Sequence, residues 1–166
     1  MENIVLIGMP SCGKSTCGVV LAKTMNKGFV DTDILIQQRE GMALQEIINK
    51  HGNAYFHQVE EDVLCGFKGY NYVVATGGSA IYYEKAMEHL KKSGKVVYLK
   101  VSLETVLERL SNIKTRGVTL AKGQTLKDLY EERIPLYEKY ADITIESEGC
   151  TVEELVEQII KKVSDF

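Results

Sequence analysis

The chain of 166 residues lacks any apolar run approaching the roughly 18 residues that a helix needs to cross a bilayer. It also lacks an excess of charge, because its formal net charge is −3 and its isoelectric point is near 5.7. A balance this close to neutrality argues against broad binding to nucleic acids or membrane surfaces. The first apolar run is short and has the pattern of a strand, so no N-terminal signal is indicated. We therefore expect a soluble, cytoplasmic protein.

Cysteine is scarce, and its spacing does not indicate a metal site. The four residues Cys12, Cys17, Cys65 and Cys150 form no C-x-x-C pair and no cysteine–histidine pattern. Free thiols in a reducing compartment are the simplest interpretation. Proline is scarcer still, with two residues, and no Pro/Ser-rich linker, repeat or low-complexity run divides the chain. Because the length suits one hydrophobic core, we expect a single domain over residues 1–166.

Short apolar segments alternate with helical patterns along the whole chain. The expected strands are residues 4–7, 28–31, 72–75, 96–99 and 143–145. Helical patterns separate them, and the last helix has Thr151 as its expected N-cap. Five such strands joined by helices imply a parallel sheet covered on both faces. We therefore predict an α/β fold with three layers, α/β/α, around a five-stranded parallel sheet.

Residues 8–15, Gly-Met-Pro-Ser-Cys-Gly-Lys-Ser, fit the phosphate-loop pattern G-x-x-x-x-G-K-[ST] at every fixed position. A buried strand precedes the loop and a helix follows it, which is the context that the motif requires. The glycines permit a tight turn of N–H groups around phosphate oxygens, Lys14 supplies a mobile charge, and Ser15 offers a hydroxyl to Mg²⁺. We therefore predict that the chain binds a nucleoside triphosphate. The candidate nucleotide-binding residues in this loop are consecutive: Ser11, Cys12, Gly13, Lys14, Ser15 and Thr16.

Two carboxylates follow the second expected strand. Asp31 and Asp33 are two residues apart, so in an extended chain both side chains point to the same side. One carboxylate near Mg²⁺ and one near an acceptor hydroxyl would serve phosphoryl transfer, which depends on positioning and charge neutralisation. The alternative is that Asp33 only caps the helix that follows.

Four segments together resemble the shikimate kinase family, in the same order and at similar spacing. They are the loop at residues 8–16, the triplet at 31–33, Ala-Thr-Gly-Gly at 75–78 and Glu-Arg-Ile-Pro-Leu-Tyr at 132–137. The resemblance covers essentially the whole chain. It implies the P-loop fold of small nucleoside monophosphate kinases, with a substrate-binding helical subdomain at about 33–62 and a lid at about 112–123. It also implies transfer of the terminal phosphoryl group of ATP to the 3-hydroxyl of shikimate, in aromatic amino-acid biosynthesis.

The same resemblance implies roles for residues around the phosphates. Lys14 would hold the phosphates as a catalytic residue, and Ser15 would ligate Mg²⁺. Asp31 would support the metal. Asp33 would bind hydroxyl groups of shikimate and act as the candidate catalytic base.

Further roles follow for the acceptor side and the lid. The backbones of Gly77 and Gly78 would approach the acceptor. Arg116 would be the catalytic lid arginine that reaches the transferring phosphoryl group, and Arg109 would lie against adenine. Arg133 would grip the substrate carboxylate, because a guanidinium fork suits a carboxylate bidentately.

Two positions depart from the family pattern. His57 stands where the family has an arginine that contacts the carboxylate, and Ser79 stands where it has a third glycine. Both remain candidate substrate-binding residues. Loss of one charged hydrogen-bonding group costs about 1.5–3 kcal/mol, so we expect weaker capture of the acceptor. Glu60 would raise the pKa of His57 and restore part of the charge.

The sequence thus predicts a monomeric kinase that uses ATP with Mg²⁺ and a small anionic hydroxy acid. Two alternatives remain open. One is a related P-loop kinase for another small hydroxylated acid, such as gluconate. The other is a nucleotide-binding regulatory protein without catalysis.

Overall fold

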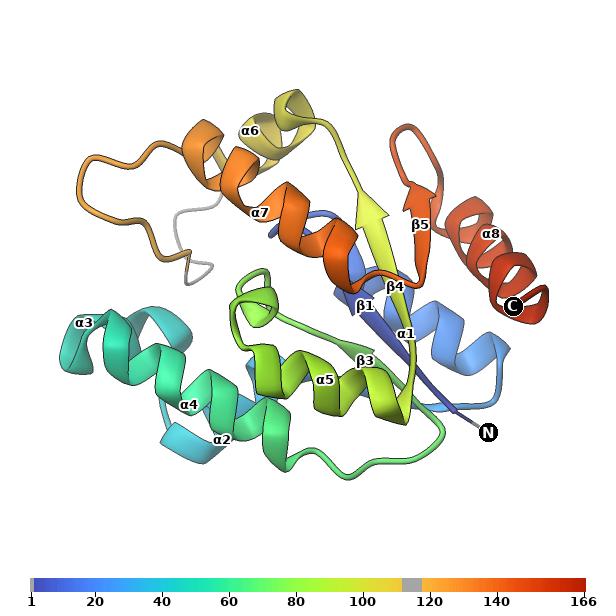
Figure 1. The fold of residues 1–166 in the computed structure, drawn as a ribbon, viewed down its shortest axis with the longest axis horizontal. Coiled ribbons are helices and arrows are strands. Elements are labelled where there is room, and N and C mark those ends of the chain that lie inside the picture. Colours follow the sequence, from blue (N-terminus) through green and yellow to red (C-terminus); the bar gives the residue numbers. More distant parts are fainter. Residues whose placement is uncertain (1, 112–117) are drawn as a thin grey trace.

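A computed structural model describes residues 2–111 and 118–166 (Figure 1). Five strands form one parallel sheet in the order β2-β3-β1-β4-β5. The strands are β1 (Asn3–Ile7), β2 (Gly28–Asp31), β3 (Tyr72–Ala75), β4 (Gly94–Lys100) and β5 (Ile143–Glu146). Every expected strand is present, so the predicted five-stranded parallel sheet is confirmed.

Helices cover both faces of this sheet, which confirms the three-layer arrangement. The helices are α1 (Lys14–Thr24), α2 (Thr32–Glu40), α3 (Leu44–His51), α4 (Asn53–Gly66), α5 (Glu84–Ser93), α6 (Leu103–Ser111), α7 (Leu126–Tyr140) and α8 (Val152–Ser164), with a 3-10 turn at Ala80–Tyr82 that the sequence analysis did not predict. In Figure 1, α5 and α7 lie in front of the sheet and α1 lies behind it, where it packs against α8. None of the described helices is long and apolar enough to cross a membrane.

The main core lies between the sheet and its covering helices. All five residues of β1 are buried, which explains why its sequence is a continuous apolar run. A strand buried on both faces has no solvent-facing positions, and the phosphate loop therefore starts from a rigid support at Ile7.

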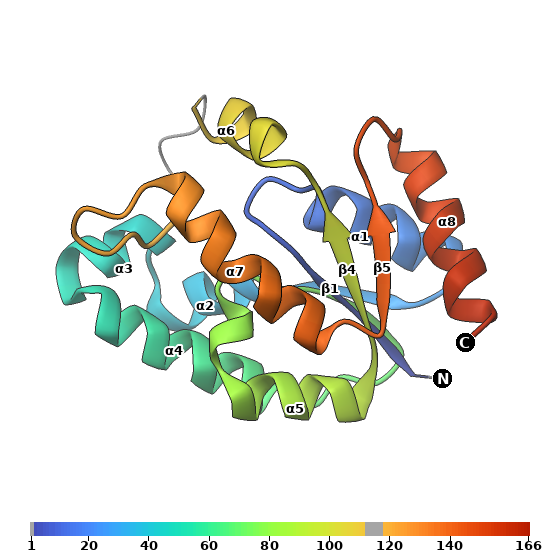
Figure 2. The ribbon, with the colours of Figure 1, turned by 45° about the horizontal axis from the view of Figure 1, so that its top comes forward.

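A second, smaller apolar cluster belongs to α2, α3 and α4. Its buried members are Ile36, Leu44, Ile47, Phe56 and Val59. Figure 2 shows these three helices grouped beside one edge of the sheet. The segment from 33 to 62 therefore contains an apolar cluster apart from the main core, and its role in substrate binding stays a prediction. Of the predicted lid at 112–123, the structure describes residues 118–123.

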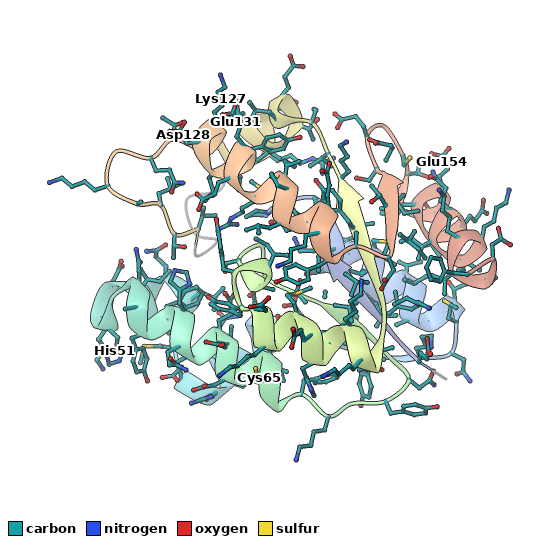
Figure 3. All side chains as sticks on the ribbon, in the orientation of Figure 1. His51, Cys65, Lys127, Asp128, Glu131 and Glu154 are labelled. Atoms are coloured by element: carbon teal, nitrogen blue, oxygen red, sulfur yellow. The ribbon has the colours of Figure 1, made fainter. Side chains whose placement is uncertain are left out.

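Helix ends follow the sequence signals. Thr151 accepts a hydrogen bond from the backbone N–H of Glu154, and the Glu154 carboxylate accepts one from the N–H of Thr151. Figure 3 labels Glu154 on α8. This reciprocal capping box confirms the expected N-cap of α8. Thr125 and Asp128 form the same arrangement at the start of α7.

Candidate active site

The phosphate loop connects β1 to α1 at the carboxyl end of the sheet. Gly13 has a φ of 95° immediately before α1, a backbone conformation that favours glycine. Nζ of Lys14 donates hydrogen bonds to the carbonyl oxygens of Gly8 at 2.8 Å and Met9 at 2.9 Å. The lysine side chain is therefore held inside the loop, and only 7% of the residue surface is exposed. The first turn of α1 directs its unpaired N–H groups out of the helix, which makes this end an anion site.

Asp31 connects the loop to the next helix. One carboxylate oxygen accepts a 2.6 Å hydrogen bond from the Ser15 hydroxyl, and the other accepts a 2.9 Å bond from the backbone N–H of Asp33. Asp31 is therefore the N-cap of α2, and Asp33 lies in the first helical turn. Both acids line the same cavity, as expected, but Asp33 lies in a helix and not in an extended strand. The alternative that Asp33 provides the cap was wrong, because Asp31 caps a helix that begins at Thr32.

A cavity of about 700 Å³ opens beside the loop and contains most of the predicted site. The predicted residues that line it are Ser11, Gly13, Lys14, Ser15, Thr16, Asp31, Asp33, Gly77, Gly78, Ser79, Arg109 and Arg133. They come from separate elements at the same end of the sheet. The cavity therefore brings a phosphate-binding loop and a wall of acidic and basic groups together.

Two glycines after β3 bring the backbone close to charged side chains. A Cβ atom on Gly77 would lie 2.8 Å from Oε2 of Glu60 and 2.9 Å from Oδ1 of Asp33. A Cβ atom on Gly78 would lie 2.8 Å from Nη1 of Arg133. Each position has room only for a hydrogen atom. A side chain on either glycine would displace the carboxylates of Glu60 and Asp33 or the guanidinium of Arg133 from the cavity wall.

Arg133 lies on α7 with only 2% of its surface exposed. Its Nε donates a 3.4 Å hydrogen bond to the Tyr82 hydroxyl, and its guanidinium carbon lies 5.3 Å from the centre of that ring. The Tyr137 hydroxyl, one helical turn further on, donates a 2.6 Å bond to the carbonyl oxygen of Gly78. Sequence reasoning assigned no role to either tyrosine. Tyr137 lies in the segment 132–137 that carried the family resemblance, whereas no sequence pattern marked Tyr82.

Glu60 is a buried carboxylate in the same wall. It accepts hydrogen bonds from the hydroxyls of Ser79 and Tyr83. Burial raises the pKa of Glu60, although the two hydroxyls and the nearby Arg133 act in the opposite direction. Sequence reasoning connected Glu60 with His57 but did not identify Tyr83.

Arg109 lies on α6 and reaches the phosphate loop. Its Nη1 donates a 2.8 Å hydrogen bond to the carbonyl oxygen of Ser11. The side chain lines the cavity at the nucleotide loop. This placement brings a planar cation to the phosphate loop.

Comparison with known proteins identifies the family. The family model for shikimate kinase matches residues 10–164. The chain belongs to the shikimate kinase family. A shikimate kinase from Caldanaerobacter subterraneus subsp. tengcongensis is 36% identical over 97% of this chain and 95% of the relative. A solved shikimate kinase from Acinetobacter baumannii in complex with shikimate has a TM-score of 0.90 and 34% identity, covering 99% of this chain and 94% of that one. The structure of the shikimate kinase from Aquifex aeolicus has a TM-score of 0.84 and 35% identity, covering 98% and 96%. These matches do not favour a gluconate kinase or a regulator without catalysis.

Two predicted site residues of this shikimate kinase family member, His57 and Cys12, are not among the described residues that line the cavity. Nδ1 of His57 lies 2.5 Å from the Tyr83 hydroxyl. Burial and then the charge of Arg133 lower the pKa of His57, so the expected rise caused by Glu60 was wrong. The Cys12 side chain is 3% exposed and belongs to the main core, so its thiol does not face the cavity. Arg116 lies outside the described residues, and its role stays a prediction.

The donor set beside the phosphate loop fits Mg²⁺. Oxygen atoms are the ligands that Mg²⁺ prefers, and it is usually bound by one or two protein groups together with substrate phosphates and waters. Ser15 and Asp31 place a hydroxyl and a carboxylate within 2.6 Å of each other at the cavity. In the part of the chain that the structure describes, no group of three or more histidine, cysteine, aspartate or glutamate side chains could hold a metal ion. The fit to Mg²⁺ therefore rests on this hydroxyl and carboxylate at the nucleotide loop.

Proposed function

We propose that this shikimate kinase family member transfers the terminal phosphoryl group of ATP to the 3-hydroxyl of shikimate. The observation that carries the proposal is the position of the Arg133 guanidinium in the cavity that also contains Asp33 and the phosphate loop. A cationic fork, a carboxylate and a polyphosphate site suit an acceptor with one carboxylate and several hydroxyls. The relative that was solved with shikimate bound supports this choice of acceptor.

On the acceptor side, Arg133 would grip the carboxylate of shikimate. Asp33 would accept a hydrogen bond from the reacting hydroxyl and take its proton as the bond to phosphorus forms. The backbones of Gly77 and Gly78 would border the ring, because neither residue carries a side chain that would fill the space. Ser79 would contribute to this wall through its bond to Glu60.

On the nucleotide side, residues 11–16 would surround the phosphates with backbone N–H groups, and Lys14 would exchange its carbonyl partners for phosphate oxygens. Arg109 would lie against the base. Ser15 and Asp31 would hold Mg²⁺, which supplies neutralisation of charge on the β- and γ-phosphates. The contacts of Arg109 with Ser11 and of Ser15 with Asp31 support these two roles.

We also propose that the protein acts as a monomer in the cytoplasm. Its four cysteines are free thiols in the structure, which is the usual state in a reducing compartment. Light scattering during gel filtration tests the oligomeric state, and a mass of twice 18.6 kDa would contradict it.

The function is tested by ADP release with Mg²⁺-ATP and a panel of hydroxy acids that includes shikimate and gluconate. We expect turnover with shikimate and a phosphate on carbon 3 by ³¹P NMR. Arg133→Lys keeps the positive charge but removes the fork, so the KM for shikimate should rise about ten- to a hundredfold while the KM for ATP changes little. Absence of ADP release at millimolar shikimate would overturn the proposal, and turnover of gluconate alone would assign another acceptor.

A further inference from the structure

His57 has partners on both of its ring nitrogens. Nδ1 lies 2.5 Å from the hydroxyl of Tyr83, and Nε2 lies 3.4 Å from Oγ1 of Thr119. Tyr83 follows the glycine turn after β3, whereas Thr119 belongs to the connection that precedes α7. The ring of His57 therefore joins α4 to two segments that are distant in sequence.

With the Glu60 carboxylate as an acceptor, the single proton of the Tyr83 hydroxyl determines which ring nitrogen of His57 carries a proton. Glu60 is 1% exposed and accepts hydrogen bonds from Ser79 and Tyr83. A tyrosine hydroxyl has a single proton, so when Tyr83 donates it to Glu60 its oxygen can only accept from Nδ1–H of His57. A neutral imidazole protonated at Nδ1 has an unprotonated Nε2, which accepts a hydrogen bond from the Thr119 hydroxyl.

The surroundings favour the neutral ring that this arrangement requires. His57 is half-buried, its ring packs beside those of Phe56 and Tyr83, and the Arg133 guanidinium is close enough to repel a second positive charge. Burial and this repulsion keep the pKa of His57 below its ordinary value. A histidine that bound a carboxylate by charge would need surroundings that favour the protonated, positively charged ring.

We infer that His57 is a positioning residue, held as the Nδ1–H tautomer by Tyr83, which fastens Thr119 to the acceptor wall through Nε2. The neighbour of Thr119, Val118, lines the cavity that Arg133 and Glu60 also line. Fixing Thr119 therefore fixes an apolar surface against the acceptor. This role rests on the proposed function and differs from direct binding of the substrate carboxylate by His57.

The tautomer is tested first, by ¹⁵N-detected NMR of histidine rings, which needs no activity. The chain has three histidines, so a His57→Asn spectrum assigns the resonances of His57. We expect a protonated Nδ1 and an unprotonated Nε2 at neutral pH, and a shift of the Nε2 resonance in Thr119→Val. A proton on Nε2, or an Nε2 resonance that Thr119→Val leaves unchanged, would overturn the inference.

Kinetics then test the consequence. Thr119→Val keeps the shape of the side chain and removes its hydroxyl, so we expect the KM for shikimate to rise about two- to tenfold with the KM for ATP unchanged. Thr119→Ser should restore the wild-type value. Thr144→Val on the exposed face of β5 is the matched control, because that residue does not line the cavity.

Coupling between the two residues separates positioning from a general structural effect. The double variant His57→Asn/Thr119→Val should have the same KM for shikimate as His57→Asn alone, because the first change already removes the shared bond. Additive effects would contradict the inference. If wild-type protein does not phosphorylate shikimate, the proposed function fails while the NMR result still decides the His57–Thr119 bond.

Discussion

The hydroxyl of Tyr137 donates a 2.6 Å hydrogen bond to the carbonyl oxygen of Gly78. This bond fastens the glycine turn after β3 to α7, the helix that also carries Arg133. The ring of Tyr137 stacks on Tyr98 of β4 with their centres 5.1 Å apart. The two tyrosines are buried neighbours, but among the described residues the Tyr98 hydroxyl has no hydrogen-bond partner.

Tyr137→Phe should lower the free energy of unfolding by about 1–3 kcal/mol, because it leaves the partly buried carbonyl of Gly78 without this donor. It should also raise the KM for shikimate, since the turn is no longer held. Urea denaturation and initial rates measure the two effects. Tyr98→Phe is the matched control and should be neutral or stabilising, because it removes a buried hydroxyl that has no hydrogen-bond partner among the described residues. Equal losses in both variants would show that the Gly78 bond has no special effect.

Gly77→Ala should reduce kcat/KM for the acceptor strongly and leave the KM for ATP nearly unchanged. The added methyl group would meet Glu60 and Asp33 at under 3 Å, so one of the carboxylates must move. Gly66→Ala at the end of α4 meets no atom within 4 Å and should stabilise the helix by about 0.5–1 kcal/mol with unchanged activity. Wild-type activity of Gly77→Ala would show that the close contact of the Gly77 backbone with Glu60 and Asp33 is not required for use of the acceptor.

Asp31 has two separable tasks, one for each carboxylate oxygen. Asp31→Ala removes both the cap of α2 and the contact with Ser15, so stability should fall by about 0.5–2 kcal/mol. Asp31→Asn keeps an oxygen for the cap but loses the charge, so stability should remain near wild type. Both variants should need more Mg²⁺ for half-maximal rate. Metal titration of the rate together with urea unfolding checks these outcomes, and an unchanged Mg²⁺ requirement in both would exclude Asp31 from the metal site.

The raised pKa of Glu60 predicts a pH dependence of stability. Folded protein retains the Glu60 proton above pH 4.5, where the unfolded chain has begun to release it, so stability falls as pH rises from 4.5 to the raised pKa. Glu60→Gln removes this term. The difference in unfolding free energy between the variant and wild type should therefore shift in favour of the variant as pH rises. It should become constant above the raised pKa of Glu60.

Urea denaturation between about pH 4 and pH 8 measures this difference. Glu131→Gln provides the control, because Glu131 is exposed on α7. Parallel curves for Glu60→Gln and wild type would contradict the direction of the shift.

Much of this fold was predictable, because its signals are local. The apolar runs of β1, β3 and β4 and the capping threonine of α8 each specify structure within a few residues. The loop at 8–15 was predictable for the same reason, since strand, glycine loop and helix are consecutive in the sequence.

Contacts between distant segments could not be predicted. Tyr137 bonds to Gly78 over 59 positions, and Thr119 lies by His57 over 62. No spacing in the sequence marks such pairs, so Tyr82 and Tyr83 went unassigned. The geometry of Asp31 and Asp33 was mistaken for a different reason, although both line the cavity. The argument placed both residues in an extended strand, but the helix begins at Thr32, before Asp33.

The apolar cluster of α2, α3 and α4 is separate from the core that supports β1. Substitutions in separate clusters usually act independently. Because Phe56 of this cluster lines the cavity, we expect that substitutions near it can change acceptor specificity during evolution while nucleotide affinity is conserved.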